Sequence, residues 1–180
     1  RFLAAHPGAE LLWTPYVESL EARSSKARHG GVNADGLPTP EITDELRNAW
    51  ARTQVLVGLD LPAGVAELFP RLELLQLASA GYDKCDLGAL ASMGVRLTTA
   101  SGLAAPSIAE FVMGRLLAEW KHSRALDAQQ RAHDWTQQMG GEVAGRTLGI
   151  VGLGALGRAI ARRARAFDMI VLATRASAQA

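Results

Sequence analysis

The chain has 180 residues, 48% of them hydrophobic, which is enough to form a core in one domain or in two small ones. Its formal net charge is only +1, so nothing in the overall charge favours binding to nucleic acid or to an anionic membrane surface. A single cysteine excludes an internal disulfide and suits a reducing compartment, and no apolar stretch approaches membrane-spanning length. We therefore expect a cytoplasmic protein.

Short apolar stretches alternate with helix-like stretches over the first half of the chain. Strands are predicted at residues 1–5, 55–59, 72–77 and 95–99. Helices are predicted at residues 10–21, 39–52 and 87–93, with a polar loop rich in glycine and proline at 24–40. In the second of these helices Thr39 is the expected N-cap and Pro40 lies in the first turn. The alternation is typical of parallel βα units, so an α/β fold is expected.

A long helix is predicted next, over residues 106–133. Two start signals overlap at its beginning: Pro106 as the first helical residue, and a capping box formed by Ser107 and Glu110. The stretch is too long for an ordinary crossover helix between two strands. We interpret it as the element that links two domains and contributes to a dimer contact.

The most informative motif is Gly152-x-Gly154-x-x-Gly157, which follows a short apolar run and opens a helical stretch. Gly152 permits a sharp turn, Gly154 lets the backbone approach a pyrophosphate, and Gly157 lets a helix pack closely on a strand. The N–H groups of Ala155 and Leu156, at the positive end of the helix dipole, would face the phosphates. In this context the motif predicts a dinucleotide-binding site.

The glycine motif begins a second domain, because the βα units described above precede it. Strands are predicted at residues 148–151 and 169–174, with a helix at 156–167 between them. A dinucleotide-binding domain needs several more βα units to complete its sheet and to cover both faces. We therefore expect the sequence to be a fragment of a longer protein or a natural truncation.

Several segments occur in the order and spacing of one known family. They are residues 77–83 (LASAGYD), Gly94-Val95, Ala109-Glu110, Trp135 and residues 145–157 (GRTLGIVGLGALG). Over about residues 50 to 177 the chain resembles the D-isomer-specific 2-hydroxyacid dehydrogenases, which include phosphoglycerate, glyoxylate/hydroxypyruvate and D-lactate dehydrogenases. The resemblance implies a flavodoxin-like substrate domain over residues 1–104. It also implies that residues 105–180 form the linking helix and the first part of a Rossmann domain that binds NAD or NADP.

The turn after the strand at residues 72–77 is the second site that the resemblance implies. In the family, backbone N–H groups at this turn hold the substrate carboxylate, and the matching positions here are Ser79, Ala80 and Gly81. Small residues let a carboxylate approach the backbone, and N–H groups suit an anion. The alternative is a plain strand-to-helix turn in which Gly81 serves only the backbone shape.

The end of the strand at residues 169–174 bears on the choice of cofactor. NAD-specific members carry an Asp there, which accepts hydrogen bonds from the ribose hydroxyls. Here the segment contains Thr174, Arg175 and Ser177. The Arg175 guanidinium cannot accept a bond from the 2′-hydroxyl but pairs well with a 2′-phosphate, and Ser177 could add a hydrogen bond, so NADP is favoured over NAD. In the alternative interpretation Arg175 is a solvated surface residue and the pocket accepts both cofactors.

The groups that would carry out hydride transfer are not expected within this chain. The family uses a His–Glu pair as general acid and an Arg that orients the substrate, all in segments beyond these 180 residues. None of the four histidines (His6, His29, His122 and His133) matches the position of the acid, and no cluster has metal-ligand spacing. We therefore predict that the 180 residues alone have no turnover.

Two functions of different classes fit these observations. The first is an oxidoreductase that transfers a hydride between a nicotinamide cofactor and a 2-keto acid or D-2-hydroxy acid. The second is a non-catalytic relative, because corepressors of the C-terminal-binding-protein type share the fold and cofactor site but act through protein partners. The carboxylate-binding turn favours the enzyme, and an Arg, a Glu and a His encoded after residue 180 would support it.

Overall fold

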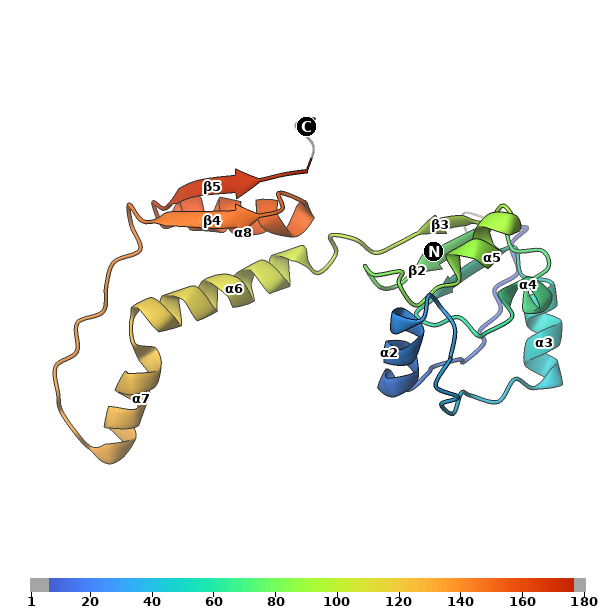
Figure 1. The fold of residues 1–180 in the computed structure, drawn as a ribbon, viewed down its shortest axis with the longest axis horizontal. Helices are drawn as coiled ribbons and strands as arrows, with labels where there is room; N and C mark the ends of the chain where they lie inside the picture. The colour runs from blue at the N-terminus through green and yellow to red at the C-terminus, as the bar shows by residue number, and fades with distance from the viewer. Residues whose placement is uncertain (1–6, 177–180) are drawn as a thin grey trace. The chain divides into compact units, whose positions relative to one another are not determined.

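The computed structural model describes residues 7–176 and divides into two compact units, Arg1–Ser101 and Gly102–Ala180 (Figure 1). The strand predicted at residues 1–5 and the predicted cofactor residue Ser177 lie outside the described residues. Both units contain parallel strands joined by helices, which confirms the predicted α/β class. Each unit is described by itself below.

The first unit is built on a parallel sheet in which the described strands have the order β1-β2-β3. Its elements are α2 (Leu20–Arg28), α3 (Asp44–Ala51), β1 (Val55–Gly58), α4 (Val65–Leu68), β2 (Leu74–Leu77), α5 (Leu87–Ser92) and β3 (Arg96–Thr98). The predictions of a strand at 55–59, 72–77 and 95–99 and of a helix at 87–93 are confirmed to within two residues at each end. The one-turn helix α4 was not predicted.

The core of the first unit forms around an aromatic group at one end of α3. Trp50 is 2% exposed, stacks on Phe69 with ring centroids 5.0 Å apart and meets the edge of Tyr16 at 5.6 Å. Leu75 and Leu77 of the central strand β2 have no exposed surface. A central strand that is covered in this way requires apolar residues, which explains why β2 was recognisable in the sequence.

The prediction of a helix at residues 10–21 is wrong. The helix α2 begins at Leu20, and the side chain of its N-cap, Ser19, accepts a hydrogen bond from the Ala22 N–H at 3.1 Å. The preceding segment is irregular because tertiary contacts hold it: Trp50 Nε1 donates to Thr14 Oγ1 at 3.1 Å, and Tyr16 packs on Trp50. Because α2 extends to Arg28, the loop predicted at 24–40 is helical in its first part.

The second predicted helix also begins later than expected. Its N-cap is Thr43, whose side chain accepts a hydrogen bond from the Leu46 N–H at 3.3 Å, and not Thr39. Asp44 and Glu45 occupy the first turn, where acidic side chains interact favourably with the helix dipole. Both threonines satisfy the sequence rule for an N-cap, so the sequence alone did not distinguish them.

The second unit packs two helices against a parallel pair of strands. Its elements are α6 (Ala105–Trp120), α7 (Ser123–Ala132), β4 (Thr147–Val151), α8 (Ala155–Ala166) and β5 (Ile170–Thr174). Helix α8 lies against the sheet and α6 runs along α8 (Figure 1). Their contact contains small residues, Ala105 and Ala109 on α6 and Ala159 on α8, which allow a close approach of the two helices. The strands and the helix predicted around the glycine motif are confirmed.

The prediction of one long helix over residues 106–133 is wrong, because the helix ends at Trp120 and a second one begins at Ser123. His122 adopts a left-handed backbone conformation with φ of 53°, which interrupts the helical hydrogen bonding. The Gly141 N–H donates to the Trp120 carbonyl at 3.0 Å, so a distant segment satisfies the end of α6. At the start of α6, Pro106 lies in the first turn and Ala104 is the N-cap, so the alternative capping box is not formed.

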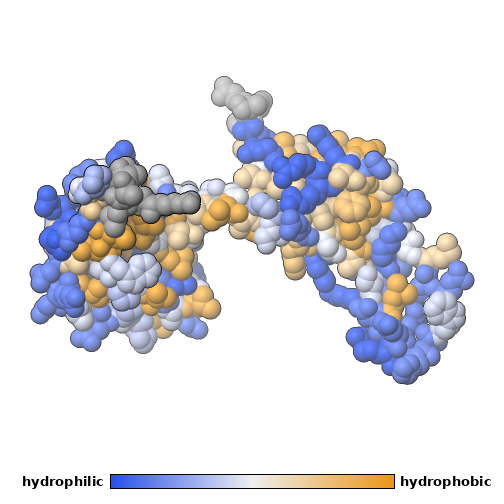
Figure 2. Space-filling model, turned by 180° about the vertical axis from the view of Figure 1, so that it is seen from behind, coloured by the Kyte–Doolittle hydropathy of each residue, from blue (hydrophilic) through white to orange (hydrophobic). Residues whose placement is uncertain are grey.

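Residues 121–140, here called the arm, leave the core at the end of α6 and return to the same place. A Cβ added to Gly140 would lie 2.8 Å from Lys121 Cα, and one added to Gly141 would lie 2.7 Å from Trp120 Nε1. Only glycine therefore fits where the arm returns. None of the residues of α7 is buried, and the surface of this region is mainly hydrophilic with isolated apolar residues (Figure 2).

Among the described residues, no helix is both long enough and apolar enough to span a membrane.

Candidate cofactor and substrate sites

The glycine motif lies at the carboxyl ends of β4 and β5. Gly152 has a positive φ of 94°, and its N–H donates to the carbonyl of Thr174, the last residue of β5, at 3.0 Å. This hydrogen bond continues the parallel pairing of the two strands to the point where the chain turns into α8. The sharp turn predicted at Gly152 is confirmed.

Gly157 is the point of closest approach between α8 and β4. A Cβ added there would lie 2.2 Å from the Gly152 carbonyl oxygen and 3.2 Å from Ile150 Cγ2. The backbone oxygen belongs to the turn itself and cannot rotate away as a flexible side chain could. The close helix–strand packing predicted from the third glycine is confirmed.

Gly154 faces open space, because no heavy atom lies within 4 Å of a Cβ added to it. It is the N-cap of α8 and provides no side-chain cap. Within residues 7–176, the N–H groups of Ala155 and Leu156 donate no hydrogen bond to the protein. Free amides at the start of a twelve-residue helix, next to a glycine without neighbours, fit the pyrophosphate of a dinucleotide.

Two arginines border the glycine motif in different ways. Arg158 Nη1 donates to the Leu153 carbonyl at 3.1 Å and so braces the turn from the first part of α8. Arg175 directly follows β5 and is exposed. Because Thr174 bonds to Gly152, the strand end that carries Arg175 lies beside the glycine motif. Arg175 is therefore available to a ligand at this edge of the sheet.

In the first unit, the turn Ser79–Gly81 follows the carboxyl end of β2. The Ser79 hydroxyl donates to the Gly81 carbonyl at 2.9 Å, and the Ala100 N–H donates to the Ser79 carbonyl at 3.0 Å. In the described part of the chain, the N–H groups of Ser79, Ala80 and Gly81 have no acceptor. The carbonyl groups of Ser79 and Gly81 thus hold the shape of the turn, whereas its amides remain free for an anion.

A hollow of about 270 Å³ adjoins this turn. Its lining residues are Leu20, Arg23, Ser24, Ala27, Ser79, Gly81, Asp83 and Lys84. Two basic side chains therefore lie beside the free amides.

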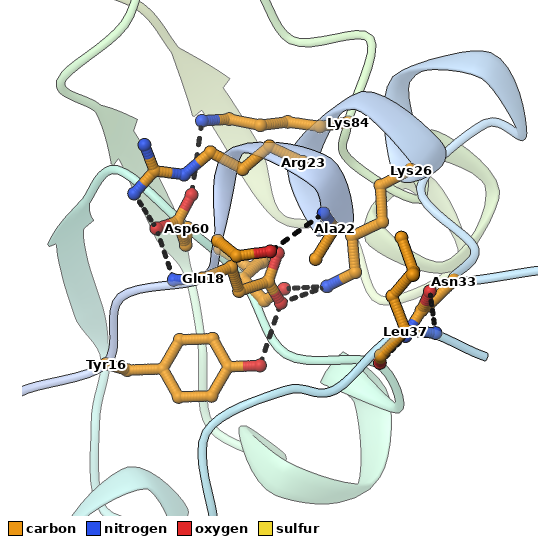
Figure 3. A network of polar contacts seen from close by, with 11 residues as sticks. Tyr16, Glu18, Ala22, Arg23, Lys26, Asn33, Leu37, Asp60 and Lys84 are labelled. Atoms are coloured by element: carbon orange, nitrogen blue, oxygen red, sulfur yellow. Dashed lines mark hydrogen bonds and ion pairs between the residues drawn. The ribbon is translucent and has the colours of Figure 1, made fainter. Parts of the chain in front are cut away.

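The carboxylate of Asp60 binds both of these basic side chains (Figure 3). Its carboxylate, which has no exposed surface, accepts hydrogen bonds from Arg23 at 2.7 Å, from Lys84 at 3.4 Å and from the Glu18 N–H at 3.0 Å. Burial raises the pKa of Asp60, but these three donors outweigh it and hold the pKa below its usual value. The carboxylate therefore stays ionised at neutral pH and keeps both cations oriented.

Arg23, Lys84 and Asp60 were not among the residues predicted for a site. Asp60 follows β1 and Lys84 follows β2, and residues after parallel strands gather at one edge of the sheet. This rule could have identified Asp60 and Lys84 as candidate site residues from the sequence. It could not have identified Arg23, because the helix that carries Arg23 was predicted at the wrong residues.

The remaining titratable candidates do not form a reactive site. Among the described residues, no group of three or more His, Cys, Asp or Glu residues could hold a metal ion. His29 lies beside its own helix, with Nδ1 2.9 Å from the Ser25 carbonyl, and His122 and His133 flank α7. Burial raises the pKa of the Cys85 thiol, which disfavours its reactive thiolate form.

Comparison with known proteins adds a family assignment to this geometry. Residues 113–180 match the family model for the NAD-binding domain of the D-isomer-specific 2-hydroxyacid dehydrogenases. Hydroxypyruvate reductase from Thermotoga maritima is 31% identical over 135 residues, which are 72% of this chain and 44% of that protein. Glyoxylate reductase from Korarchaeum cryptofilum is 33% identical over 137 residues, 73% of this chain and 41% of that protein.

The chain belongs to the D-isomer-specific 2-hydroxyacid dehydrogenase family. The resemblance identified in the sequence is thereby confirmed.

Solved structures of dehydrogenases agree with this family assignment. A dehydrogenase from Rhizobium meliloti, 27% identical, superimposes with a TM-score of 0.61 over 77% of this chain and 50% of the other. D-lactate dehydrogenase from Aquifex aeolicus, 22% identical with a TM-score of 0.61, shares the fold. The β4–α8–β5 segment of the present chain is thus part of a Rossmann NAD-binding domain. These relatives are dehydrogenases and reductases, which does not favour the corepressor-like alternative.

The chain spans less than half the length of these curated 2-hydroxyacid dehydrogenase relatives. Activity, substrate and partners are therefore properties of the whole protein and are treated below as proposals.

Proposed function

We propose that this protein is an oxidoreductase that transfers a hydride between a nicotinamide cofactor and a 2-keto acid or D-2-hydroxy acid. The observation that carries the proposal is the pairing of two anion-binding backbones in one family member. The free amides after Gly154 suit a pyrophosphate, and those of Ser79, Ala80 and Gly81 suit a carboxylate. The bound cofactor would supply or accept the hydride.

In this proposal each unit has a separate task. Residues 1–104 form a flavodoxin-like substrate domain, in which the Ser79–Gly81 turn orients the keto acid by its carboxylate. Residues 105–180 belong to the cofactor domain, in which Gly152, Gly154 and Gly157 shape the turn and the N–H groups of Ala155 and Leu156 bind the phosphates. None of His29, His122 and His133 lines the hollow beside the Ser79–Gly81 turn, and in this proposal the family's His–Glu pair, in segments outside these residues, supplies the proton to the substrate carbonyl.

The proposal is tested by assaying the product of the complete coding sequence with glyoxylate and hydroxypyruvate, while following the oxidation of NADH or NADPH. We expect reduction of at least one of the two keto acids. The same assay on residues 1–180 alone is expected to give no turnover, because the family resemblance assigns the general acid and the substrate-orienting arginine to segments outside these residues. If the complete protein reduces no 2-keto acid with either cofactor, the proposal fails.

We further propose that NADP is preferred over NAD, because Arg175 stands where an acidic residue would bind the ribose hydroxyls. In the complete protein, Arg175→Asp is expected to weaken NADPH binding about tenfold or more, which corresponds to roughly 1.4 kcal/mol, and to strengthen NADH binding. Affinities are measured by titration of cofactor fluorescence. Arg162→Asp is the matched control, because Arg162 is also exposed and lies on α8. Tighter binding of NADH by the unmodified protein, or an unchanged preference in the Arg175 variant, would contradict this assignment.

The arm supports the proposal of a homodimer formed through the second unit. It has no buried residue in α7, yet Trp135 is 95% exposed and Met139 81% exposed. Apolar side chains on a segment without a core of its own would gain from burial against a second copy. The mass of the complete protein in solution, measured by light scattering, tests this. A location in the cytoplasm is proposed from the single cysteine alone.

A further inference from the structure

The hollow beside the Ser79–Gly81 turn is larger than a single carboxylate requires, and its lining contains two kinds of anion-binding group. These are the turn with its free amides, and the side chains of Arg23 and Lys84. The side chains of Arg23 and Lys84 are 21% and 14% exposed, so both are held in position rather than extended into solvent. Ser79, Arg23 and Lys84 line the same hollow, and a ligand bound to the turn would therefore lie close to both cations.

The hydrogen bonds to Asp60 leave the two cations with unused donors. The Asp60 carboxylate accepts three hydrogen bonds, from Arg23, from Lys84 and from the Glu18 N–H. The cations are not saturated: in the described part of the chain Arg23 donates a hydrogen bond only through Nη2, to Asp60, and the Lys84 contact is long at 3.4 Å. Two positive charges against one buried negative charge leave a surplus of one positive charge at the wall of the hollow.

One acidic group opposes this surplus. Asp83 also lines the hollow, and one of its carboxylate oxygens would lie 3.0 Å from a Cβ added to Gly81. Asp83 is exposed, so water screens its charge more effectively than it screens the buried cluster around Asp60. Removing the Asp83 charge should therefore strengthen the attraction of the hollow for an anion, a change opposite in direction to the loss of either cation.

We infer that this hollow binds a second anionic group of the substrate, so that the preferred substrates are 2-keto acids that carry a distal carboxylate or phosphate. The turn holds the carboxylate next to the keto group, and Arg23 and Lys84 bind the distal group. Arg23 offers a planar pair of donors and Lys84 a single strong charge, an arrangement suited to either anion. This inference rests on the proposed function and specifies its substrate class.

The test compares three substrates with the complete protein: hydroxypyruvate, whose distal group is neutral, 3-phosphonooxypyruvate and 2-oxoglutarate. We expect kcat/KM to be at least about tenfold higher for one of the two substrates with a distal anion than for hydroxypyruvate. Whichever of the two is preferred distinguishes a phosphate from a carboxylate. Arg23→Gln and Lys84→Gln are expected to lower this ratio about tenfold through KM, and Asp83→Asn is expected to raise it.

Controls separate recognition of the anion from stability. Arg47→Gln removes an exposed cation of the first unit away from the hollow and should leave the ratio unchanged. Lys84→Arg keeps the charge and should keep the ratio, which a loss of folding would not allow. Should either glutamine variant fail to fold, the ratio for the unmodified protein at low and high salt replaces it, because screening must reduce the preference.

Turnover of hydroxypyruvate as efficient as that of both substrates with a distal anion would overturn the inference while leaving the proposed function intact. So would glutamine variants that lower kcat/KM equally for all three. A protein that reduces none of the three substrates would instead contradict the proposed function and the inference with it.

Discussion

Gly157→Ala is expected to destabilise the second unit by about 3 kcal/mol and to abolish measurable cofactor binding. The new methyl group would lie 2.2 Å from the Gly152 carbonyl oxygen, a separation at which one of the two backbone segments must move. Gly152 is itself fixed by its hydrogen bond to Thr174, so the movement would separate α8 from the carboxyl ends of β4 and β5. Thermal unfolding and titration with NADPH measure the two effects.

Gly154→Ala is the matched control for this experiment. The same methyl group added at Gly154 meets no heavy atom within 4 Å, so the unfolding temperature should be nearly unchanged. Cofactor affinity should nevertheless fall, because the methyl group occupies the space in which the pyrophosphate would approach the backbone. A Gly154 variant that binds cofactor normally would mean that the free amides of α8 are not the phosphate site. A Gly157 variant with normal stability would contradict the packing described for α8.

Lys26→Met is expected to lower the free energy of unfolding by about 3–5 kcal/mol. Lys26 is 1% exposed, and its ammonium group donates to Glu18 Oε1 and to the Leu61 carbonyl, the latter at 2.7 Å. Glu18 is 4% exposed and would be left as a buried carboxylate without its counterion. The Tyr16 hydroxyl would still donate a hydrogen bond to Glu18 at 2.8 Å. Burial and this hydrogen bond raise the pKa of Tyr16, so its phenol stays protonated. A neutral hydroxyl cannot compensate for the lost charge. Chemical denaturation of the purified variant and of the unmodified protein measures the difference in their free energies of unfolding.

Two further variants show whether breaking the buried Lys26–Glu18 ion pair causes this loss of stability. The double change of Lys26→Met with Glu18→Gln removes both charges and should recover part of the lost stability. Arg52→Met removes one partner of an exposed ion pair, Arg52 to Glu10 at 2.9 Å, and should change the stability by less than about 1 kcal/mol. Equal losses from the buried and the exposed pair would show that the buried Lys26–Glu18 pair stabilises the fold no more than an exposed ion pair does.

The sequence predicts those parts of the fold that depend on local pattern. The strand β2 was predicted correctly because a strand with a buried face requires apolar residues, and the β4–α8–β5 segment because the glycine turn between its strand and helix has a fixed spacing. The extended segment before Ser19 could not be predicted in this way, because contacts of Thr14 and Tyr16 with Trp50 hold it. The break at His122 likewise depends on Gly141, which is distant in sequence.

The candidate sites also differ in whether a local sequence pattern predicts them. Backbone sites, such as the turn at Gly81 and the loop at Gly154, were predictable because small residues mark where a ligand can approach the main chain. The cluster of Asp60, Arg23 and Lys84 was not, because its members come from three separate segments of the first unit and carry no common spacing. Their convergence exists only once α2 has packed beside the sheet edge.

The hydrogen bond between Gly141 and Trp120 allows the arm to vary in length during evolution. Because the chain closes on itself there, the excursion between these residues can change in length without moving α6 or the strand that follows. The entropy of closing such a loop depends only weakly on the number of residues in it, so insertions and deletions are tolerated. The arm can therefore be replaced by a segment of different length and sequence during evolution. Such a replacement would change the surface that contacts another subunit while the cofactor-binding core keeps its sequence.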